Sequence, residues 1–486
     1  MNVQLENTFA RDLPDMFDPW TADQIAQPKA LIINDRLANE LGIDSALLHS
    51  DEGTKFLVGN TLAPGSTPIA QAYAGHQFGG YSPRLGDGRA LLLGELITPD
   101  GRRVDLHLKG SGRTRFARSG DGKAAVGPML REYVISEAMH ALGIPTTRAL
   151  SVVATNEMVR REQMLPGAVL CRVASSHLRI GSFQYAATLS EDHVARLVDY
   201  SIERHYPKLA TADNKAFALL EAVIKAQSDL VAKWIGVGFV HGVMNTDNMT
   251  ISGETIDYGP CAFIDAYRRD AVFSSIDHGG RYAFANQPHI ARWNIARFAE
   301  TLLPLIGSDE DQVVDKVTKR LDWFPYDYRD AWRVMMCDKL GMSRHNAIDS
   351  ALFQMLLELF AKQQLDYTNG MRALSDVLRN KPERMYAQLT DRAAFDDWAE
   401  KWIYVLGTEN RDFHEIADEM DRVNPAYIPR NHLVEIALDS ATNGDLGPLN
   451  ELLNVLSEPF TERPGLDKFT QPMPADWEGY QTFCGT

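Results

Sequence analysis

The most constraining feature of the sequence is an ordered set of polar residues near its middle. The segment His241-Gly-Val-Met-Asn-Thr-Asp-Asn248 is followed nine residues later by Asp257-Tyr-Gly259. Asn and Asp side chains supply hard oxygen ligands, and neither a cysteine pair nor a histidine pair is present here to select zinc. Asn248 and Asp257 therefore predict a Mg²⁺ or Mn²⁺ site of the kind that bridges phosphates.

The same spacing is that of the protein-kinase catalytic loop, H-R-D-x-x-x-x-N, followed by D-F-G. His241 sets the frame, and Asn248 stands seven positions further on. Val243 occupies the position of the aspartate that takes the substrate proton, and Asp247 is the nearest acid that could replace it. Such a site can still bind a nucleotide and react at a different phosphate. The structural alternative is that Asn248 and Asp257 only form turns.

The composition is that of an ordinary soluble globular protein. The chain has 486 residues, of which 45% are apolar and 23% are charged. A formal net charge of -16 argues against nucleic-acid and anionic-membrane partners, which require a basic surface. Four irregularly spaced cysteines, with no signal segment and no long apolar run, predict a cytoplasmic protein without a disulfide framework. The oligomeric state is not indicated.

The order of the elements predicts an α+β fold with two lobes, as in protein kinases. Residues 1–84 are rich in Pro, Gly and Asn and are expected to form an irregular N-terminal extension. Residues 85–189 are expected to form a strand-rich lobe, and residues 190–461 a helical lobe with the catalytic loop and the metal motif. Residues 462–486 complete the chain as an extended tail. The predicted elements are strands at 89–97, 104–108, 149–154 and 168–173 and helices at 128–143 and 215–234.

A glycine-rich turn and a lysine at the end of a strand precede the catalytic loop in kinase order. Gly86, Gly88 and Arg89 lie just before the first strand of the predicted hairpin, where free backbone amides can approach phosphates. Lys109 ends the second strand, in the position of the kinase lysine that pairs with phosphates. Each feature alone is consistent with a plain turn or a solvated lysine. The ordered set favours a nucleotide site.

Charged residues on the next helix and on a later strand complete the predicted site. Glu132 is the preferred partner of Lys109, because the five residues that separate it from Glu137 turn a helix by about 140°. Glu137 is then expected to be a solvated or capping charge. Arg172 and Arg179 are suited to bidentate capture of phosphate, and surface salt bridges are the alternative.

Several longer motifs resemble those of the selenoprotein O family, which consists of SelO/YdiU-type pseudokinases. The resemblance runs nearly end to end. The motifs are Tyr73-Ala-Gly-His-Gln-Phe-Gly-Gly80, Leu85-Gly-Asp-Gly-Arg-Ala90, Leu108-Lys-Gly-Ser-Gly112, Gly120-Asp-Gly122, Arg131-Glu-Tyr133, Ser136-Glu-Ala-Met139, Gly143-Ile-Pro-Thr-Thr-Arg-Ala149, His241-Gly-Val-Met-Asn-Thr-Asp-Asn-Met249, Ile256-Asp-Tyr-Gly-Pro260 and Gly280-Arg-Tyr282.

The resemblance implies a kinase-like fold that binds ATP in a reversed orientation. It implies transfer of AMP from ATP, or of UMP from UTP, to Ser, Thr or Tyr hydroxyls of proteins, with pyrophosphate released. It implies that Asn248 and Asp257 bind Mg²⁺ or Mn²⁺ and that Asp247 acts as the base. Asp247, Lys109 and Glu132 would then be the catalytic residues. The nucleotide would be held by Gly86, Gly88, Arg89, Lys109, Asp121, Gly122, Arg172, Arg179 and Asp257.

In one respect the chain departs from the family pattern. The family often carries Sec or Cys third from the C-terminus, here Cys484, and in some members this residue pairs with a cysteine in the activation-loop region. The corresponding segment, residues 270–277, has no cysteine, which leaves Cys261 near the metal motif. The resemblance therefore does not extend to redox control through that pair.

Two other functions compete with nucleotidyl transfer. An ordinary protein kinase would transfer the γ-phosphate, and a catalytically inactive scaffold would only bind nucleotide. The valine at position 243 speaks against the kinase, and the joint retention of Lys109, Asn248 and Asp257 speaks against the scaffold.

Overall fold

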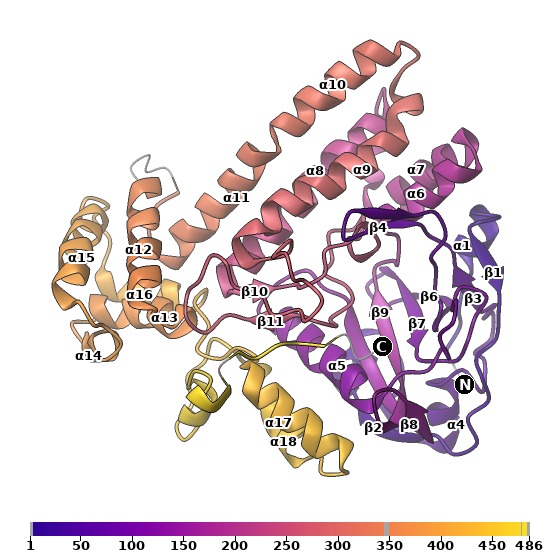
Figure 1. Cartoon of the computed structure of the whole chain (residues 1–486), viewed down its shortest axis with the longest axis horizontal. Helices are drawn as coiled ribbons and strands as arrows, with labels where there is room; N and C mark the ends of the chain where they lie inside the picture. Colours follow the sequence, from indigo (N-terminus) through magenta and orange to yellow (C-terminus); the bar gives the residue numbers. More distant parts are fainter. Residues whose placement is uncertain (1–2, 345–348, 478, 484–486) are drawn as a thin grey trace.

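A seven-stranded antiparallel sheet forms one end of the molecule, and helices form the rest (Figure 1). The computed structural model describes residues 3–344, 349–477 and 479–483. The strand order in the sheet is β1-β3-β6-β7-β9-β8-β2. These strands are β1 (Phe17–Pro19), β2 (Lys29–Ile33), β3 (Ile69–Gln71), β6 (Ala90–Ile97), β7 (Arg103–Lys109), β8 (Arg148–Arg160) and β9 (Met164–Ala174).

Strand β7 lies at the centre of this sheet, and its two faces differ in chemistry. Leu106 and Leu108 pack into a hydrophobic cluster with the short helices α2 (Asp35–Glu40), α3 (Ser45–Leu48) and α4 (Asp51–Phe56). Asp105, His107 and Lys109 alternate with them, so they share the opposite face, and all three are buried. One face of a central strand thus carries buried polar groups.

Helix α5 (Val126–Ala141) packs against β8 and β9. Pro128 lies in its first turn, and Gly143, with a φ of 72°, follows its end in the left-handed region. The predicted helix at 128–143 and the four predicted strands of this region are confirmed, although β8 continues to Arg160 and β9 begins at Met164.

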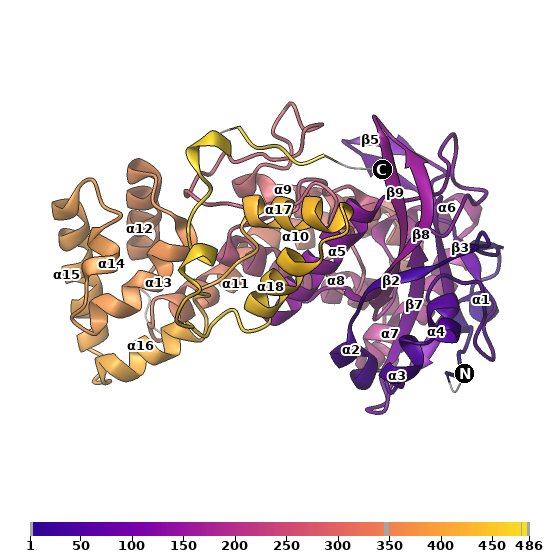
Figure 2. The ribbon, with the colours of Figure 1, turned by 90° about the horizontal axis from the view of Figure 1, so that it is seen from below.

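The helical part extends away from the sheet (Figure 2). One hydrophobic cluster joins α5 to the neighbouring helices, and a second lies around the stacked Trp398 and Trp402. The helices are α6 (Ile180–Leu189), α7 (Glu191–His205), α8 (Lys215–Val237), α9 (Gln287–Ile306), α10 (Glu310–Asp322), α11 (Phe324–Lys339), α12 (Asp349–Gln363), α13 (Tyr367–Leu378), α14 (Glu383–Tyr386), α15 (Arg392–Gly407), α16 (Phe413–Asp421), α17 (Asn431–Thr442) and α18 (Gly447–Leu456).

Two small hairpins frame the central motifs. Strand β10 (Phe239–Val240) leads into His241, and its partner β11 (Ala262–Phe263) follows the segment that contains Asp257. The loop between them includes the one-turn helix η2 (Thr246–Asn248). The hairpin of β4 (Gly75–Gln77) and β5 (Gly80–Ser82) packs against η2 and α6.

The prediction that residues 1–84 are irregular is wrong. This segment contributes β1, β2 and β3 to the main sheet, together with α1 (Thr8–Asp12) and α2 to α4. Short strands at the edge of a sheet lack the long alternating pattern by which strands are recognised. Residues 462–477 and 479–483 are irregular apart from the short 3-10 helices η4 (Asp467–Phe469) and η5 (Ala475–Trp477), and Cys484 lies outside the described residues. No helix in the described ranges has the length and apolar character needed to cross a membrane.

Candidate active site

Asp257 lies at the centre of a cluster of cations. Its Oδ1 is 3.0 Å from Lys109 Nζ and 2.6 Å from Arg172 Nη2. Its Oδ2 is 2.5 Å from Arg179 Nη1 and accepts a 3.3 Å hydrogen bond from Asn248 Nδ2. Burial alone would raise the pKa of Asp257, but the three cations hold it well below its ordinary value. The chain therefore brings together four residues predicted from separate motifs around one carboxylate.

Glu132 of α5 holds two of these cations from the other side. Its carboxylate is 2.6 Å from Lys109 Nζ and 2.7 Å from Arg172 Nε. The expected pairing of Lys109 with Glu132 is confirmed. Glu137 is not a solvated or capping charge, because it forms a bidentate pair with Arg148 at 2.9 and 2.7 Å.

The register of the sheet places the two strand-borne cations. Lys109 is opposite Leu170 and His107 is opposite Arg172 across the antiparallel pair β7 and β9, so these side chains share the face that meets α5. The surface alternatives are wrong, since Lys109, Arg172 and Arg179 are only 9%, 1% and 3% exposed. Burial of three cations is costly unless acids or a ligand compensate them.

Asp247 lies beside this cluster and has an unsatisfied oxygen. Its backbone oxygen accepts a hydrogen bond of 2.6 Å from Arg179 Nη1, whereas its buried Oδ1 has no hydrogen-bond partner. Burial raises the pKa of Asp247 to about 6, an effect that Arg179 partly opposes. A carboxyl group with that pKa can exchange a proton near neutral pH.

Asn248 and Asp257 meet the basic requirements of a magnesium site. The Asn248 amide nitrogen donates a 3.3 Å hydrogen bond to Asp257 Oδ2, so the two side chains are adjacent, and each carries an oxygen that can bind a metal. Among the residues described, no group of three or more His, Cys, Asp and Glu side chains could hold a metal without help. A two-residue oxygen site that leaves positions for phosphate oxygens and water suits Mg²⁺ or Mn²⁺.

The glycine-rich turn is shaped by packing. A Cβ on Gly86 would lie 2.5 Å from the Phe116 ring, and one on Gly88 would lie 2.9 Å from the Phe116 backbone oxygen. Between the two glycines, buried Asp87 accepts a hydrogen bond of 3.1 Å from His107 Nε2 if that nitrogen carries the proton. The turn is therefore fixed to β7 next to Lys109.

Asp121 and Gly122 lie on the outer part of the same cavity. Asp121 is exposed and pairs with Arg161 at 2.9 Å. Gly122 has a φ of 74°, and a Cβ there would lie 2.2 Å from the backbone nitrogen of Arg113. Both residues lie on the loop between β7 and α5.

One cavity of about 1060 Å³ joins all of these groups. Sequence reasoning missed His107, Tyr73 and Gln77, which also line it. Tyr73 stacks against Arg179, with the guanidinium carbon 4.9 Å from the ring centre. His107 could have been found from the strand pattern, because it lies two residues before Lys109 and so faces the same way. Every predicted site residue lines the cavity: Gly86, Gly88, Arg89, Lys109, Asp121, Gly122, Glu132, Arg172, Arg179, Asp247, Asn248 and Asp257.

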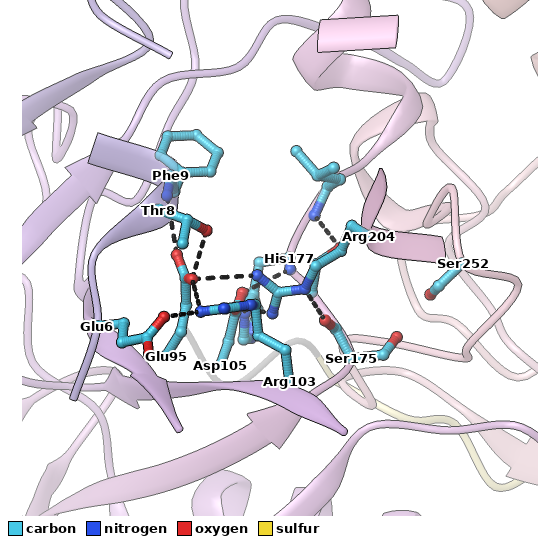
Figure 3. A network of polar contacts seen from close by, with 12 residues as sticks. Glu6, Thr8, Phe9, Glu95, Arg103, Asp105, Ser175, His177, Arg204 and Ser252 are labelled. Atoms are coloured by element: carbon cyan, nitrogen blue, oxygen red, sulfur yellow. Dashed lines mark hydrogen bonds and ion pairs between the residues drawn. The ribbon is translucent and has the colours of Figure 1, made fainter. Parts of the chain in front are cut away.

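A polar network around Glu95 and Asp105 lies beside β7 (Figure 3). The His107 ring stacks on His177 at 4.0 Å, and His177 Nδ1 is 2.9 Å from Asp105. Asp105 in turn is 2.6 Å from Arg204 of α7. Nearby Glu95 is fully buried and accepts hydrogen bonds from the N-terminal segment and from Arg103. This network fixes the strand that carries Lys109.

Comparison with known proteins gives one consistent family. The family model described as protein adenylyltransferase SelO matches residues 1–457 of this chain. A protein nucleotidyltransferase YdiU of Pseudarthrobacter chlorophenolicus is 56% identical over 491 residues, which cover 100% of this chain and 98% of the relative. The relative of the same name from Chromobacterium violaceum is 52% identical over 478 residues, which cover 98% of this chain and 100% of the relative.

Proposed function

Because this chain belongs to the protein adenylyltransferase SelO family and is a protein nucleotidyltransferase, we propose that it transfers AMP from ATP to Ser, Thr or Tyr hydroxyls of proteins. The nucleotide would enter with its terminal phosphates toward Lys109, Arg172 and Arg179. The fold would be that of a two-lobed kinase with the nucleotide reversed between the lobes. A reducing cytoplasm would suit the buried free thiols of Cys171 and Cys261.

The observation that carries the proposal is the position of the cations. Lys109, Arg172 and Arg179 converge on one buried point of the cavity, on the face of the sheet and next to Asp257. Three cations at one point can neutralise the terminal phosphates of a triphosphate. The α-phosphate would then face the acceptor hydroxyl. The reversed nucleotide would also explain why Val243 occupies the position of the ordinary kinase base.

Asp247 would act as the base. The acceptor oxygen forms a bond to the α-phosphorus, the bond from that phosphorus to the bridging oxygen of pyrophosphate breaks, and the hydroxyl proton passes to a carboxylate oxygen of Asp247. Its unpartnered Oδ1 and its pKa of about 6 suit that role. Glu132 would keep Lys109 and Arg172 oriented while they hold phosphate.

Asn248 and Asp257 would hold Mg²⁺ or Mn²⁺. When bound, the ion supplies charge neutralisation for the phosphates and for the leaving pyrophosphate. The neighbouring cations and the ion would together carry most of the catalysis, as positioning and electrostatics do in phosphoryl transfer generally.

The direct test uses ATP labelled at the α- or the γ-phosphate. We expect transfer of the α-label to protein, including self-labelling, and little transfer of the γ-label. Asp257→Ala should abolish transfer, because it removes the carboxylate that binds the metal and orders the cations. Dominant γ-transfer would indicate an ordinary kinase, and no transfer of either label would indicate a scaffold. The same assay with UTP labelled at its α-phosphate measures whether UMP is transferred as well.

A further inference from the structure

The β4–β5 hairpin carries part of the motif Tyr73–Gly80, to which the proposed chemistry gives no role. The ring of Phe78 in its turn is 39% exposed, and the ring of Tyr81 on β5 is 47% exposed. In the described part of the chain the hairpin forms a sheet of only these two strands. Figure 1 shows β4 between the main sheet and helices α6 and α9. Exposed aromatic rings on a small, separate hairpin are typical of an interaction surface.

The hairpin is bonded to the catalytic loop. The His76 backbone N–H donates to Thr246 Oγ1 at 2.7 Å, and the Phe78 N–H donates to Asn245 Oδ1 at 3.0 Å. A Cβ on Gly75 would lie 2.6 Å from Asp247 Oδ1, so the hairpin backbone lies directly against the proposed base. The exposed tip is therefore held at a fixed position relative to Asp247.

A cation without a carboxylate partner lies beside this tip. Arg281 stacks over Trp293 at 4.8 Å and lies next to Gly79. Half-buried Arg281 also lies over the Tyr282 ring at 5.7 Å, and its guanidinium has no ion pair with a carboxylate among the described residues. Such a group can pair with an acidic side chain of a partner.

Apolar side chains continue around the opening of the cavity. Ile276 and Phe483 are 49% and 69% exposed, and both line the cavity together with Phe78. Exposed apolar groups thus line the cavity that contains Asp247, and Arg281 lies beside the hairpin turn that carries one of them. A free nucleotide would instead use the buried cations deeper in the cavity.

We propose that Phe78, Tyr81, Ile276 and Arg281 form an acceptor surface that binds an extended, hydroxyl-bearing segment of the protein substrate. The segment would place an apolar side chain against Phe78 and an acidic side chain against Arg281, with its hydroxyl over Asp247. This inference rests on the proposed function, because the reaction requires a polypeptide to reach Asp247 through this opening.

Peptide binding tests the surface independently of the chemistry. Two fluorescent peptides each contain a serine flanked by leucine, and they differ only in the outer residues, which are aspartates in one peptide and lysines in the other. Binding of each peptide is measured by fluorescence anisotropy in the presence of a non-hydrolysable ATP analogue. We expect the acidic peptide to bind the wild type about tenfold more tightly than the basic one. Phe78→Asn, which keeps a residue tolerant of the φ of 51°, should weaken binding about fivefold or more. Arg281→Glu should reverse the preference.

Matched controls lie on α15, at the opposite end of the molecule (Figure 1). Tyr404→Asn changes a ring that is 74% exposed, and Lys401→Glu reverses an exposed charge; neither should alter peptide binding. The affinity for ATP, measured by calorimetry, should stay within about twofold in the Arg281 variant and in both control variants.

Three outcomes would overturn the acceptor surface: no binding of the acidic peptide to the wild type, equal binding to the Phe78 and Arg281 variants, or a change of oligomeric state in those variants, which would indicate contact with a second copy. Peptide binding that behaves as expected without any transfer of α-label would instead contradict the proposed function alone.

Discussion

At the scale of single residues, Asp257 compensates the burial of three neighbouring cations. Together with Glu132 it supplies two negative charges against the three positive charges of Lys109, Arg172 and Arg179. Around Asp257 the three cations are already oriented toward one point. Pre-orientation of this kind lowers the entropic cost of capturing a phosphate.

Substitution of the two arginines distinguishes the reversed orientation of ATP from other orientations of the nucleotide. Arg172→Ala or Arg179→Ala should weaken ATP binding about ten- to hundredfold, because each lost charge-assisted contact is worth about 1.5–3 kcal/mol. AMP binding should change little, since AMP has no terminal phosphates. Calorimetric titration of ATP, ADP and AMP measures the difference.

The control for these variants is Arg148→Ala. Arg148 is also largely buried and paired with acids, but it contacts Glu137 and Glu40 and does not line the cavity. It should leave the affinities for all three nucleotides unchanged. An equal loss for ATP and AMP in the Arg172 and Arg179 variants would contradict the assignment of terminal phosphates to these cations.

The protonation of Asp247 predicts a pH dependence. Because its pKa is raised to about 6, the carboxyl group is protonated below that pH and cannot accept the hydroxyl proton. The rate of α-label transfer should therefore fall about tenfold per pH unit below pH about 6 and level off above it. Initial rates in the wild type and Asp247→Asn, with circular dichroism at each pH to exclude unfolding, measure this. The same dependence in a residually active Asn variant would assign the titration to another group.

At the scale of elements, β7 shows what the alternating pattern could and could not predict. The alternation of Val104 to Leu108 indicated a strand with two different faces, and the strand is where the pattern placed it. Alternation usually indicates one solvated face. Here the polar face is buried, because α5 and α7 supply Glu132 and Arg204 as partners for Lys109 and Asp105. Such partners come from distant segments, so a local pattern does not reveal them.

The helix α5 was the most predictable element, and it settled the choice between two glutamates. A helical turn of about 140° between Glu132 and Glu137 allows only one of them to face Lys109. The pairing of Glu137 with Arg148 could not be predicted, since it depends on where β8 crosses the helix. Periodicity therefore predicts which face a residue lies on, and tertiary packing decides its partner.

At the scale of the whole molecule, the site residues were predicted better than the segments that support them. Motifs with fixed spacing identified the residues around Asp257. The contribution of β1 to β3 to the sheet was missed, because each is short and its pairing is long-range. The N-terminal segment also covers buried Glu95, to which the Phe9 N–H donates at 2.8 Å. Because Phe9 and Glu95 are far apart in the sequence, their pairing is determined by the fold as a whole.

The C-terminal tail connects distant parts of the site, and its removal gives the last prediction. Thr482 Oγ1 donates to the backbone oxygen of Pro260 at 2.8 Å, and the Thr482 N–H donates to that of Phe273 at 2.8 Å. Tyr480 Oη lies 3.2 Å from Arg131 of α5, next to Glu132. The tail thus joins α5 to the segment that follows Asp257. Figure 2 shows it crossing the molecule toward the sheet.

Truncation after Gln471 should therefore loosen the site while leaving the two main hydrophobic cores in place. Loss of a few hydrogen bonds, each worth about 1 kcal/mol, should lower the melting temperature by about 2–5 °C. Transfer of α-label should fall more than ATP affinity does, because the lost contacts orient Glu132 and the segment after Asp257, and the truncation also removes Phe483 from the lining of the cavity. Scanning fluorimetry, calorimetry and the label assay measure these three quantities.

Thr482→Val, which removes only the bond to Pro260, is the graded control and should show a smaller loss of transfer. A truncated chain with the wild-type melting temperature and transfer rate would show that the tail only lies on the surface.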